Sequence, residues 1–178
     1  MRDIVRLGLI LMIVCGVAAG SLAWVYQTTK PVIETRKQEE LNAALKIVMK
    51  DADAFEPVRK DGKTVYLAKK GGKEVGVAIP VESKGYGSTP ISMLVGIDMD
   101  GKVVKVKVLS HGETAGLGSR IENDSFTDQF AGKSAKDPLE VKRDVDALSG
   151  ATISSKGVTN GVKNALTLFG EMFGGKKS

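Results

Sequence analysis

The chain has 178 residues, a length that suits one compact domain with an appendage. Its formal net charge is +5, and its basic residues form no stripe interleaved with aromatic side chains, so nucleic acid is not an expected partner. The single cysteine, Cys15, excludes an internal disulfide. Because the chain also has only one histidine, we expect no zinc site or other metal centre.

The first segment is apolar and long enough to cross a bilayer. Residues 7–29 carry no charge and supply the roughly 20 apolar residues that a membrane-spanning helix needs. Trp24 and Tyr26 stand at the far end, where interfacial aromatics are expected. The alternative is a cleaved signal peptide with small residues at 18–20, but its apolar region is usually only about 7–15 residues long. We therefore expect residues 1–29 to form a cytoplasmic end and a retained helix in contact with membrane lipid.

The next segment, residues 30–50, is expected to be a linking helix. Pro31 suits the first turn of a new helix, and Leu41, Leu45 and Val48 fall on one face of it. The charges around the apolar stretch do not decide its orientation, because basic residues flank both ends. These residues are Arg2, Arg6, Lys30, Arg36 and Lys37.

From residue 51 the pattern changes to strands. Residues 64–68 and 74–81 pair naturally across one turn, and the alternating runs 91–99 and 104–108 meet at another. The turn signals are Asp61-Gly62, Gly71-Gly72 and Asp100-Gly101. Alternation of apolar and polar side chains is typical of an antiparallel sheet with one solvent-facing side.

Helices close the chain. A short helix is expected at 125–130, and apolar residues recur at helical spacing from Ser155 to Phe173, with Ser154 as the N-cap. Gly157 and Gly161, four residues apart, would let this helix pack close to the sheet. The predicted fold class is α+β: a single N-terminal transmembrane helix, then a compact domain at 51–173 of antiparallel sheet packed with helices, and a tail at 174–178.

The run from Asp146 to Ser154 is the most distinctive stretch. Ser149, Gly150 and Ala151 have almost no side chain, so another molecule can approach the backbone closely. Thr152 follows with a hydroxyl, just ahead of the predicted helix, whose free N–H groups and dipole favour a phosphate.

Two more glycine-rich motifs precede this run: Gly85-Tyr86-Gly87-Ser88, and the eight residues from His111 to Gly118, H-G-E-T-A-G-L-G. Together and in this order, the three resemble the FMN-binding domain shared by the G subunit of the Rnf complex and the C subunit of the sodium-pumping NADH:quinone reductase. The resemblance covers roughly residues 60–170. Ala115, where the family often has proline, is the one departure noted.

The resemblance implies FMN bound covalently, through its phosphate, to Thr152. A separate flavin transferase would attach it at a motif that comprises Asp146, Ser149, Gly150 and Ala151. The residues implied to contact the cofactor are Gly85, Tyr86, Gly87, Ser88, His111, Glu113, Thr114, Leu117 and Gly118, with Lys156 as a candidate counter-charge. Three roles stay open. Tyr86 either contacts the ring or is a core tyrosine, His111 either shuttles a proton or fixes a loop, and Lys156 either faces the phosphate or is solvated.

The same resemblance implies a function. The chain would be a membrane-anchored electron carrier, with its flavin domain on the extracytoplasmic side of the inner membrane, in a ferredoxin:NAD oxidoreductase that translocates ions. It would work among other subunits and perform no substrate chemistry itself, because the cofactor does the redox work. The alternatives are the equivalent subunit of the quinone reductase, whose longer insertions are missing here, an anchored flavin-binding sensor or accessory module, and a structural domain without cofactor.

Overall fold

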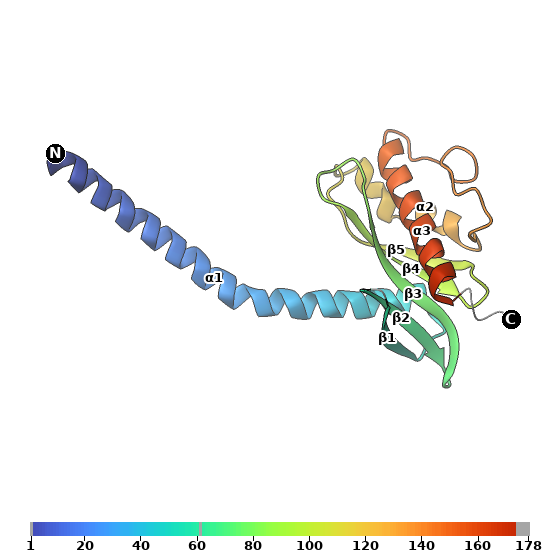
Figure 1. Ribbon diagram of the computed structural model, residues 1–178. Coiled ribbons are helices and arrows are strands. Elements are labelled where there is room, and N and C mark those ends of the chain that lie inside the picture. Colours follow the sequence, from blue (N-terminus) through green and yellow to red (C-terminus); the bar gives the residue numbers. More distant parts are fainter. Residues whose placement is uncertain (1, 61, 174–178) are drawn as a thin grey trace. The chain divides into compact units, whose positions relative to one another are not determined.

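The computed structural model describes residues 2–60 and 62–173. The chain forms two compact units that divide between residues 40 and 41. The first unit is helical, and the second contains the sheet and the remaining helices (Figure 1). The tail expected at 174–178 lies outside the described residues.

The first helix, α1 (Arg2–Val48), runs without a break through Pro31, where the sequence predicted a new helix to begin. Proline lacks one helical N–H, so the helix continues there without one of its backbone hydrogen bonds, and the threonine hydroxyls one turn to either side bond back to backbone carbonyls of the helix. Thr28 donates to the carbonyl of Val25, and Thr35 donates to that of Pro31. Among the described residues, α1 is the one helix long and apolar enough to cross a membrane.

The sheet is an antiparallel meander, in the order β1-β2-β3-β4-β5. Its strands are β1 (Ala54–Lys60), β2 (Lys63–Lys70), β3 (Lys73–Ser83), β4 (Ile91–Asp98) and β5 (Val103–Ser110). The predicted hairpins at Gly71-Gly72 and at Asp100-Gly101 are confirmed by the pairing of β2 with β3 and of β4 with β5. Of the third predicted turn, Asp61-Gly62, Asp61 lies outside the described residues.

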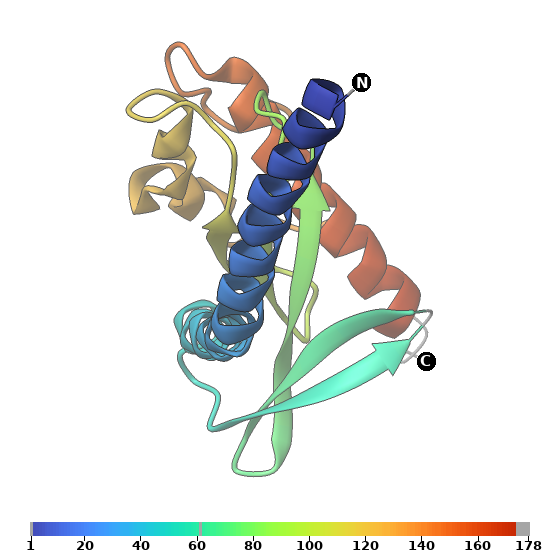
Figure 2. The same cartoon turned by 90° about the vertical axis from the view of Figure 1, so that its left-hand side faces the viewer.

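One face of the sheet is covered by the last helix, α3 (Thr152–Phe173). Its apolar side packs on the inward residues of the strands, and Ile91, Met93, Val95 and Ile97 of β4 all belong to this core. The predicted close approach is confirmed at Gly161, where an added Cβ would lie 2.6 Å from the Cε of Met93. The N-terminal half of the helix lies at the end of β3 (Figure 2), where the Ser83 hydroxyl donates to the carbonyl of Gly157.

The other face is covered at its centre, which corrects the prediction of one solvent-facing side. The last turns of α1 pack there, and the buried residues of this second core are Ala44, Leu45, Val48, Met49, Ala68, Ala78 and Leu94. Gly96 permits the approach, because a Cβ at this position would lie 2.6 Å from the carbonyl oxygen of Val48. Strand alternation puts Leu94 and Gly96 on the face opposite Ile91 and Met93, and the pattern alone does not show that a distant helix covers that face.

Three short helical segments lie between β5 and α3: η1 (Gly118–Glu122), α2 (Asp124–Thr127) and η2 (Asp128–Phe130). The last two confirm the short helix expected at 125–130. Phe126 and Phe130 are buried there with their rings edge to face, at a centroid separation of 5.8 Å.

A compact loop then leads into the run that begins at Asp146. The carboxylate of Asp144 organises it by accepting hydrogen bonds from the backbone N–H groups of Leu139 and Glu140, at 3.1 and 2.7 Å, and from the Lys133 ammonium at 3.2 Å. Burial alone would raise the pKa of Asp144. The bonds from Glu140, Lys133 and Leu139 outweigh it, so this pKa is lowered.

The contact at Gly96 predicts a steric effect. Gly96→Ala should lower the free energy of unfolding by about 1–3 kcal/mol, because the added methyl group meets a backbone oxygen that cannot move aside cheaply. Gly170→Ala is the matched control: it lies within α3 and has open space around its Cβ position, so it should leave stability equal or slightly raised. Urea unfolding of the detergent-solubilised protein, followed by circular dichroism, measures both. Equal stabilities for the two variants would contradict the contact.

The loop at Asp144 predicts a pH dependence. Because its pKa is lower in the folded than in the unfolded chain, its stabilisation is complete above the unfolded value near 4 and is lost as the pH falls through the folded value. Asp144→Asn should be less stable at pH 7, by about 1 kcal/mol or more, and should lose less stability on acidification. Asp51→Asn, at an exposed carboxylate, is the control. Parallel pH profiles of the wild type and Asp144→Asn would contradict this role.

Candidate functional site

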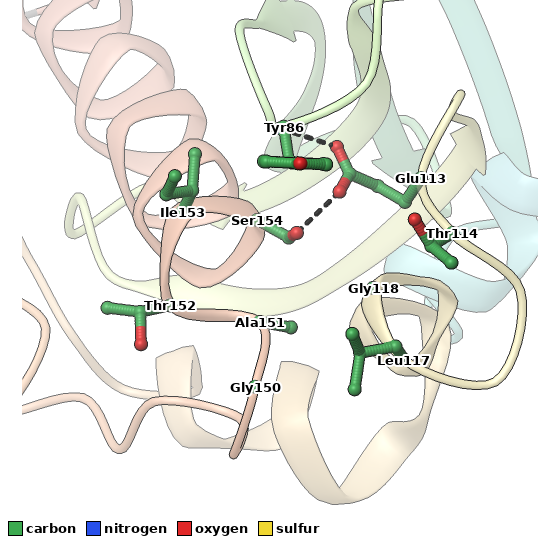
Figure 3. A pocket seen from close by; sticks show the side chains of 10 residues that line it. All are labelled: Tyr86, Glu113, Thr114, Leu117, Gly118, Gly150, Ala151, Thr152, Ile153 and Ser154. Atoms are coloured by element: carbon green, nitrogen blue, oxygen red, sulfur yellow. Dashed lines mark hydrogen bonds between the residues drawn. The ribbon is translucent and has the colours of Figure 1, made fainter.

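Three segments that are far apart in the sequence line one cavity of about 490 Å³ (Figure 3). This volume lies within the range of small-molecule sites. The lining residues are Tyr86, Glu113, Thr114, Leu117, Gly118, Gly150, Ala151, Thr152, Ile153 and Ser154. The three motifs singled out in the sequence therefore each contribute to a single pocket.

The small-residue run forms a tight turn before α3. The N–H of Ala151 donates to the carbonyl of Leu148 at 2.9 Å, and Gly150 has a φ of +77°, a value that glycine adopts at little cost. A side chain at Gly150 would also meet Leu117, whose Cδ1 lies 2.8 Å from the position of an added Cβ. Glycine at position 150 thus permits the positive φ of the turn and leaves room for Leu117 in the pocket wall.

The helix starts earlier than predicted. Thr152 is its first residue, so Ser154 is not the N-cap but a buried residue of the first turn. Its hydroxyl donates to the carboxylate of Glu113, 41 residues away in sequence. This bond draws Ser154 inward, and a local capping pattern cannot reveal such a long-range partner.

Ser155 was not predicted to have a role, and it holds the turn in place. It is fully buried, and its hydroxyl donates to the carbonyl of Ala151 at 2.9 Å and accepts from the N–H of Leu148 at 3.0 Å. A signal for its burial was present, because Ser155 precedes Val158 and Val162 by three and seven residues and so falls on the buried side of α3.

The start of α3 suits an anion. The first N–H groups of a helix have no partner within it, and here the first to bond is that of Ser155, to the carbonyl of Ala151. The N–H groups of Thr152, Ile153 and Ser154 and the helix dipole therefore favour negative charge at this end of the pocket. Lys156 is exposed and does not line this pocket but a different hollow, beside Leu139 and Val141, which favours the solvated alternative.

Glu113 is the charged group of the pocket, and its side chain is held by protein donors. One carboxylate oxygen accepts from the N–H groups of Tyr86 and Gly87, at 2.8 and 3.2 Å, and the other accepts from Ser154. Burial alone would raise the pKa of Glu113, but the bonds from Ser154, Gly87 and Tyr86 outweigh it and lower this pKa. Glu113 is therefore a carboxylate at neutral pH.

The glycines around Glu113 leave room for its carboxylate. A Cβ at Gly118 would lie 2.8 Å from one carboxylate oxygen, and a Cβ at Gly85 would collide with the other. Of the Gly85–Ser88 motif, Tyr86 lines the pocket, while Gly87 and Ser88 line a neighbouring hollow. Tyr86 is 69% exposed, which excludes the core-tyrosine alternative.

His111 fixes the loop and does not line the pocket. Its Nδ1 accepts the N–H of Glu113 at 3.1 Å, and its Nε2 lies 2.7 Å from a carboxylate oxygen of Glu122. Since Nδ1 is an acceptor, the ring proton is on Nε2, which donates to Glu122. This arrangement favours the loop-fixing alternative over a proton shuttle.

Asp146 lies outside the pocket and is exposed, and its N–H donates to the side-chain oxygen of Gln129 at 2.7 Å. Ser149 is also exposed, at the corner of the turn. Within residues 2–60 and 62–173, no three histidine, cysteine, aspartate or glutamate side chains come together as a metal site.

Comparison with known proteins identifies the family of the chain. A family profile described as FMN-binding domain matches residues 85–167, and another described as RnfG N-terminal region matches residues 1–48. The chain is similar in fold to two solved structures. One is NqrC of Shewanella oneidensis (24% identity, TM-score 0.55, 74% of each chain) and the other is the C subunit of the Na(+)-translocating NADH-quinone reductase of Parabacteroides distasonis (24% identity, TM-score 0.51, 62% of each chain).

Two relatives are similar over nearly their whole length. The G subunit of the proton-translocating ferredoxin:NAD(+) oxidoreductase complex of Clostridium ljungdahlii is 40% identical over 172 residues, covering 93% of this chain and 91% of the relative. The G subunit of the Na(+)-translocating ferredoxin:NAD(+) oxidoreductase complex of Acetobacterium woodii is 31% identical over 193 residues, covering 94% and 92%. The chain therefore belongs to the family of G subunits of ion-translocating oxidoreductase complexes.

Proposed function

We propose that this protein is the membrane-anchored flavoprotein subunit that relays electrons within an ion-translocating ferredoxin:NAD oxidoreductase complex, and that it carries FMN bound covalently to Thr152. The observation that carries the proposal is the meeting of all three motifs at one pocket, with Thr152 at the N-terminal end of α3. Family membership supplies the context of a complex with other subunits.

The residues of the pocket fit FMN. Tyr86, Leu117 and Ile153 offer exposed apolar surface to a flat ring, and the first-turn N–H groups of α3 offer donors to a phosphate. When bound, the flavin supplies the electron transfer. The protein would hold the phosphate of the flavin at the helix end, and it keeps a negative charge nearby at Glu113.

Thr152 is the best-placed hydroxyl in its neighbourhood. Ser154 and Ser155 are buried, and their hydroxyls already bond to Glu113 and Ala151. Ser149 is exposed on the turn and does not line the pocket. Thr152 is half-buried and does line it, so a phosphate joined there lies at the positive end of α3.

Attachment by a separate flavin transferase agrees with this geometry. Threonine is a weak nucleophile that needs a base, and within the described part of the chain no carboxylate or imidazole hydrogen-bonds to the Thr152 hydroxyl. The exposed side chains of Asp146 and Ser149 lie on the accessible side of the same run, where an enzyme can contact them.

We place the protein in the inner membrane, with α1 as its single span and the flavin domain on the extracytoplasmic side. The length and composition of α1 support the span. The equivalent role in a sodium-pumping quinone reductase is the second candidate, favoured by the similarity in fold to the C subunit of that enzyme. The identity of 40% to a G subunit of a ferredoxin:NAD(+) oxidoreductase complex favours the first.

Removing the Thr152 hydroxyl tests the attachment. Thr152→Ala, expressed with a flavin transferase, should carry no covalent FMN, because no other hydroxyl of the run is both free and within the pocket. Thr152→Ser should retain partial attachment, and Thr167→Ala, an exposed hydroxyl farther along α3, should retain all of it. Peptide mass spectrometry locates the modification, and covalent FMN on Thr152→Ala would overturn the assignment.

The anchor is tested by its topology. The mature protein should retain the residues before Tyr26 and leave the membrane only with detergent, whereas an N-terminus near Ser21 would indicate a cleaved signal.

A cysteine introduced by Lys73→Cys in the β2–β3 hairpin should react with an impermeant maleimide in right-side-out vesicles. The native Cys15, within the apolar stretch, should react only after solubilisation. Labelling of the introduced cysteine in inverted vesicles alone would place the domain on the cytoplasmic side.

A further inference from the structure

Tyr86 lines the pocket, but its side chain is largely exposed and does not by itself fix the position of the residue. The side chain is 69% exposed, and the residue belongs to the irregular link between β3 and β4. An exposed ring on such a link is normally mobile. Its position therefore depends on what holds the backbone of the link.

The backbone is held by Glu113. The N–H groups of Tyr86 and Gly87 both donate to one oxygen of this carboxylate, and the other oxygen accepts from Ser154 in the first turn of α3 (Figure 3). Glu113 itself is only 9% exposed. One buried carboxylate thus joins three segments of the pocket.

We propose that Glu113 is a positioning residue, which holds Tyr86 at the pocket wall and ties that wall to the helix turn that begins with Thr152. This rests on the proposed flavin function, which makes Tyr86 a neighbour of the cofactor. A carboxylate has about four acceptor positions, and three of those of Glu113 are taken by protein donors. Most of its hydrogen-bonding capacity is therefore directed to the protein, as a positioning role requires.

Substitutions at position 113 distinguish this positioning role from a direct effect of the carboxylate's charge. Glu113→Gln keeps the acceptor oxygen for Tyr86 and Gly87, and its amide can donate to the Ser154 oxygen, so the three segments stay joined without the charge. Glu113→Asp keeps the charge but is one methylene shorter, so it cannot reach both partners. Glu113→Ala removes both the charge and the bonds.

The first measurement needs no flavin. In a Thr152→Ala background, which carries no covalent FMN by the proposed function, amide hydrogen exchange is recorded for Tyr86 and Gly87. Adding Glu113→Ala or Glu113→Asp should speed this exchange roughly tenfold or more, the factor that a hydrogen bond to a charged group supplies. Glu113→Gln and the control Glu56→Gln, at an exposed carboxylate on β1, should leave it unchanged. Unchanged exchange in both Glu113→Ala and Glu113→Asp would overturn the proposal whatever the cofactor is.

The second measurement uses the protein with covalent FMN verified by intact mass. The visible circular dichroism of the flavin reports how the ring is held. Tyr86→Ala should lose part of this signal, Glu113→Asp and Glu113→Ala should lose the same part, and combining either with Tyr86→Ala should cause no further loss, because the two changes act through one contact. Fully additive losses, or a Glu113→Gln variant as impaired as Glu113→Ala, would overturn the proposal in favour of a direct effect of the charge.

The two measurements separate this proposal from the function on which it rests. If no covalent FMN is found on the wild-type protein, the proposed function fails, and the exchange of the Tyr86 and Gly87 amides still decides whether Glu113 holds them. If FMN is attached and the exchange does not respond, the function stands and the positioning role fails. Should Glu113→Ala not fold, Glu113→Asp supplies the same arm of both measurements.

Discussion

The close packing of α3 on the sheet is the constraint on which the pocket depends. At Gly157 the helix backbone lies so near the end of β3 that an added Cβ would be 2.8 Å from the carbonyl oxygen of Lys84 and 3.2 Å from the Cα of Gly85. Ser83 donates to the carbonyl of Gly157 at 2.7 Å and closes the same contact. Because of this approach, the first turn of α3 lies next to the link that carries Tyr86, and the pocket wall can be shared between them.

Within this frame, polar groups in the interior hold the irregular backbone. The turn before α3 is joined to the helix by Ser155, the loop before that turn is organised by Asp144, and the β3–β4 link is joined to Glu113. Each of these side chains supplies acceptors to backbone N–H groups that a strand or helix would otherwise satisfy. No buried side-chain nitrogen or oxygen among the described residues is left without a partner. Such satisfied networks rigidify a site, which suits a cofactor carrier that must hold its flavin through many turnovers.

The pocket combines opposite electrostatic tendencies at short range. The N-terminal turn of α3 favours a phosphate, whereas Glu113 presents a carboxylate that its hydrogen bonds keep ionised. The carboxylate is directed toward protein donors and the helix end is open, so the two do not compete for the same ligand group. A charged phosphate and a neutral ring can therefore occupy different ends of the pocket.

The sequence alone determined the features that depend on local composition. The apolar run predicts a candidate membrane span, glycine pairs predict the hairpin turns, and the order of three short motifs identifies the family and points to Thr152 as the proposed attachment site. Each of these is encoded by neighbouring residues, so no tertiary contact is needed to recognise it. The tertiary structure decided the rest. Ser154 and Ser155 turn inward, the last turns of α1 bury Leu94 on the second face of the sheet, and His111 and Lys156 do not line the pocket. The physical reason is that these outcomes depend on partners distant in sequence, such as Glu113 for Ser154 or Val48 for Gly96, which periodicity and local motifs do not contain.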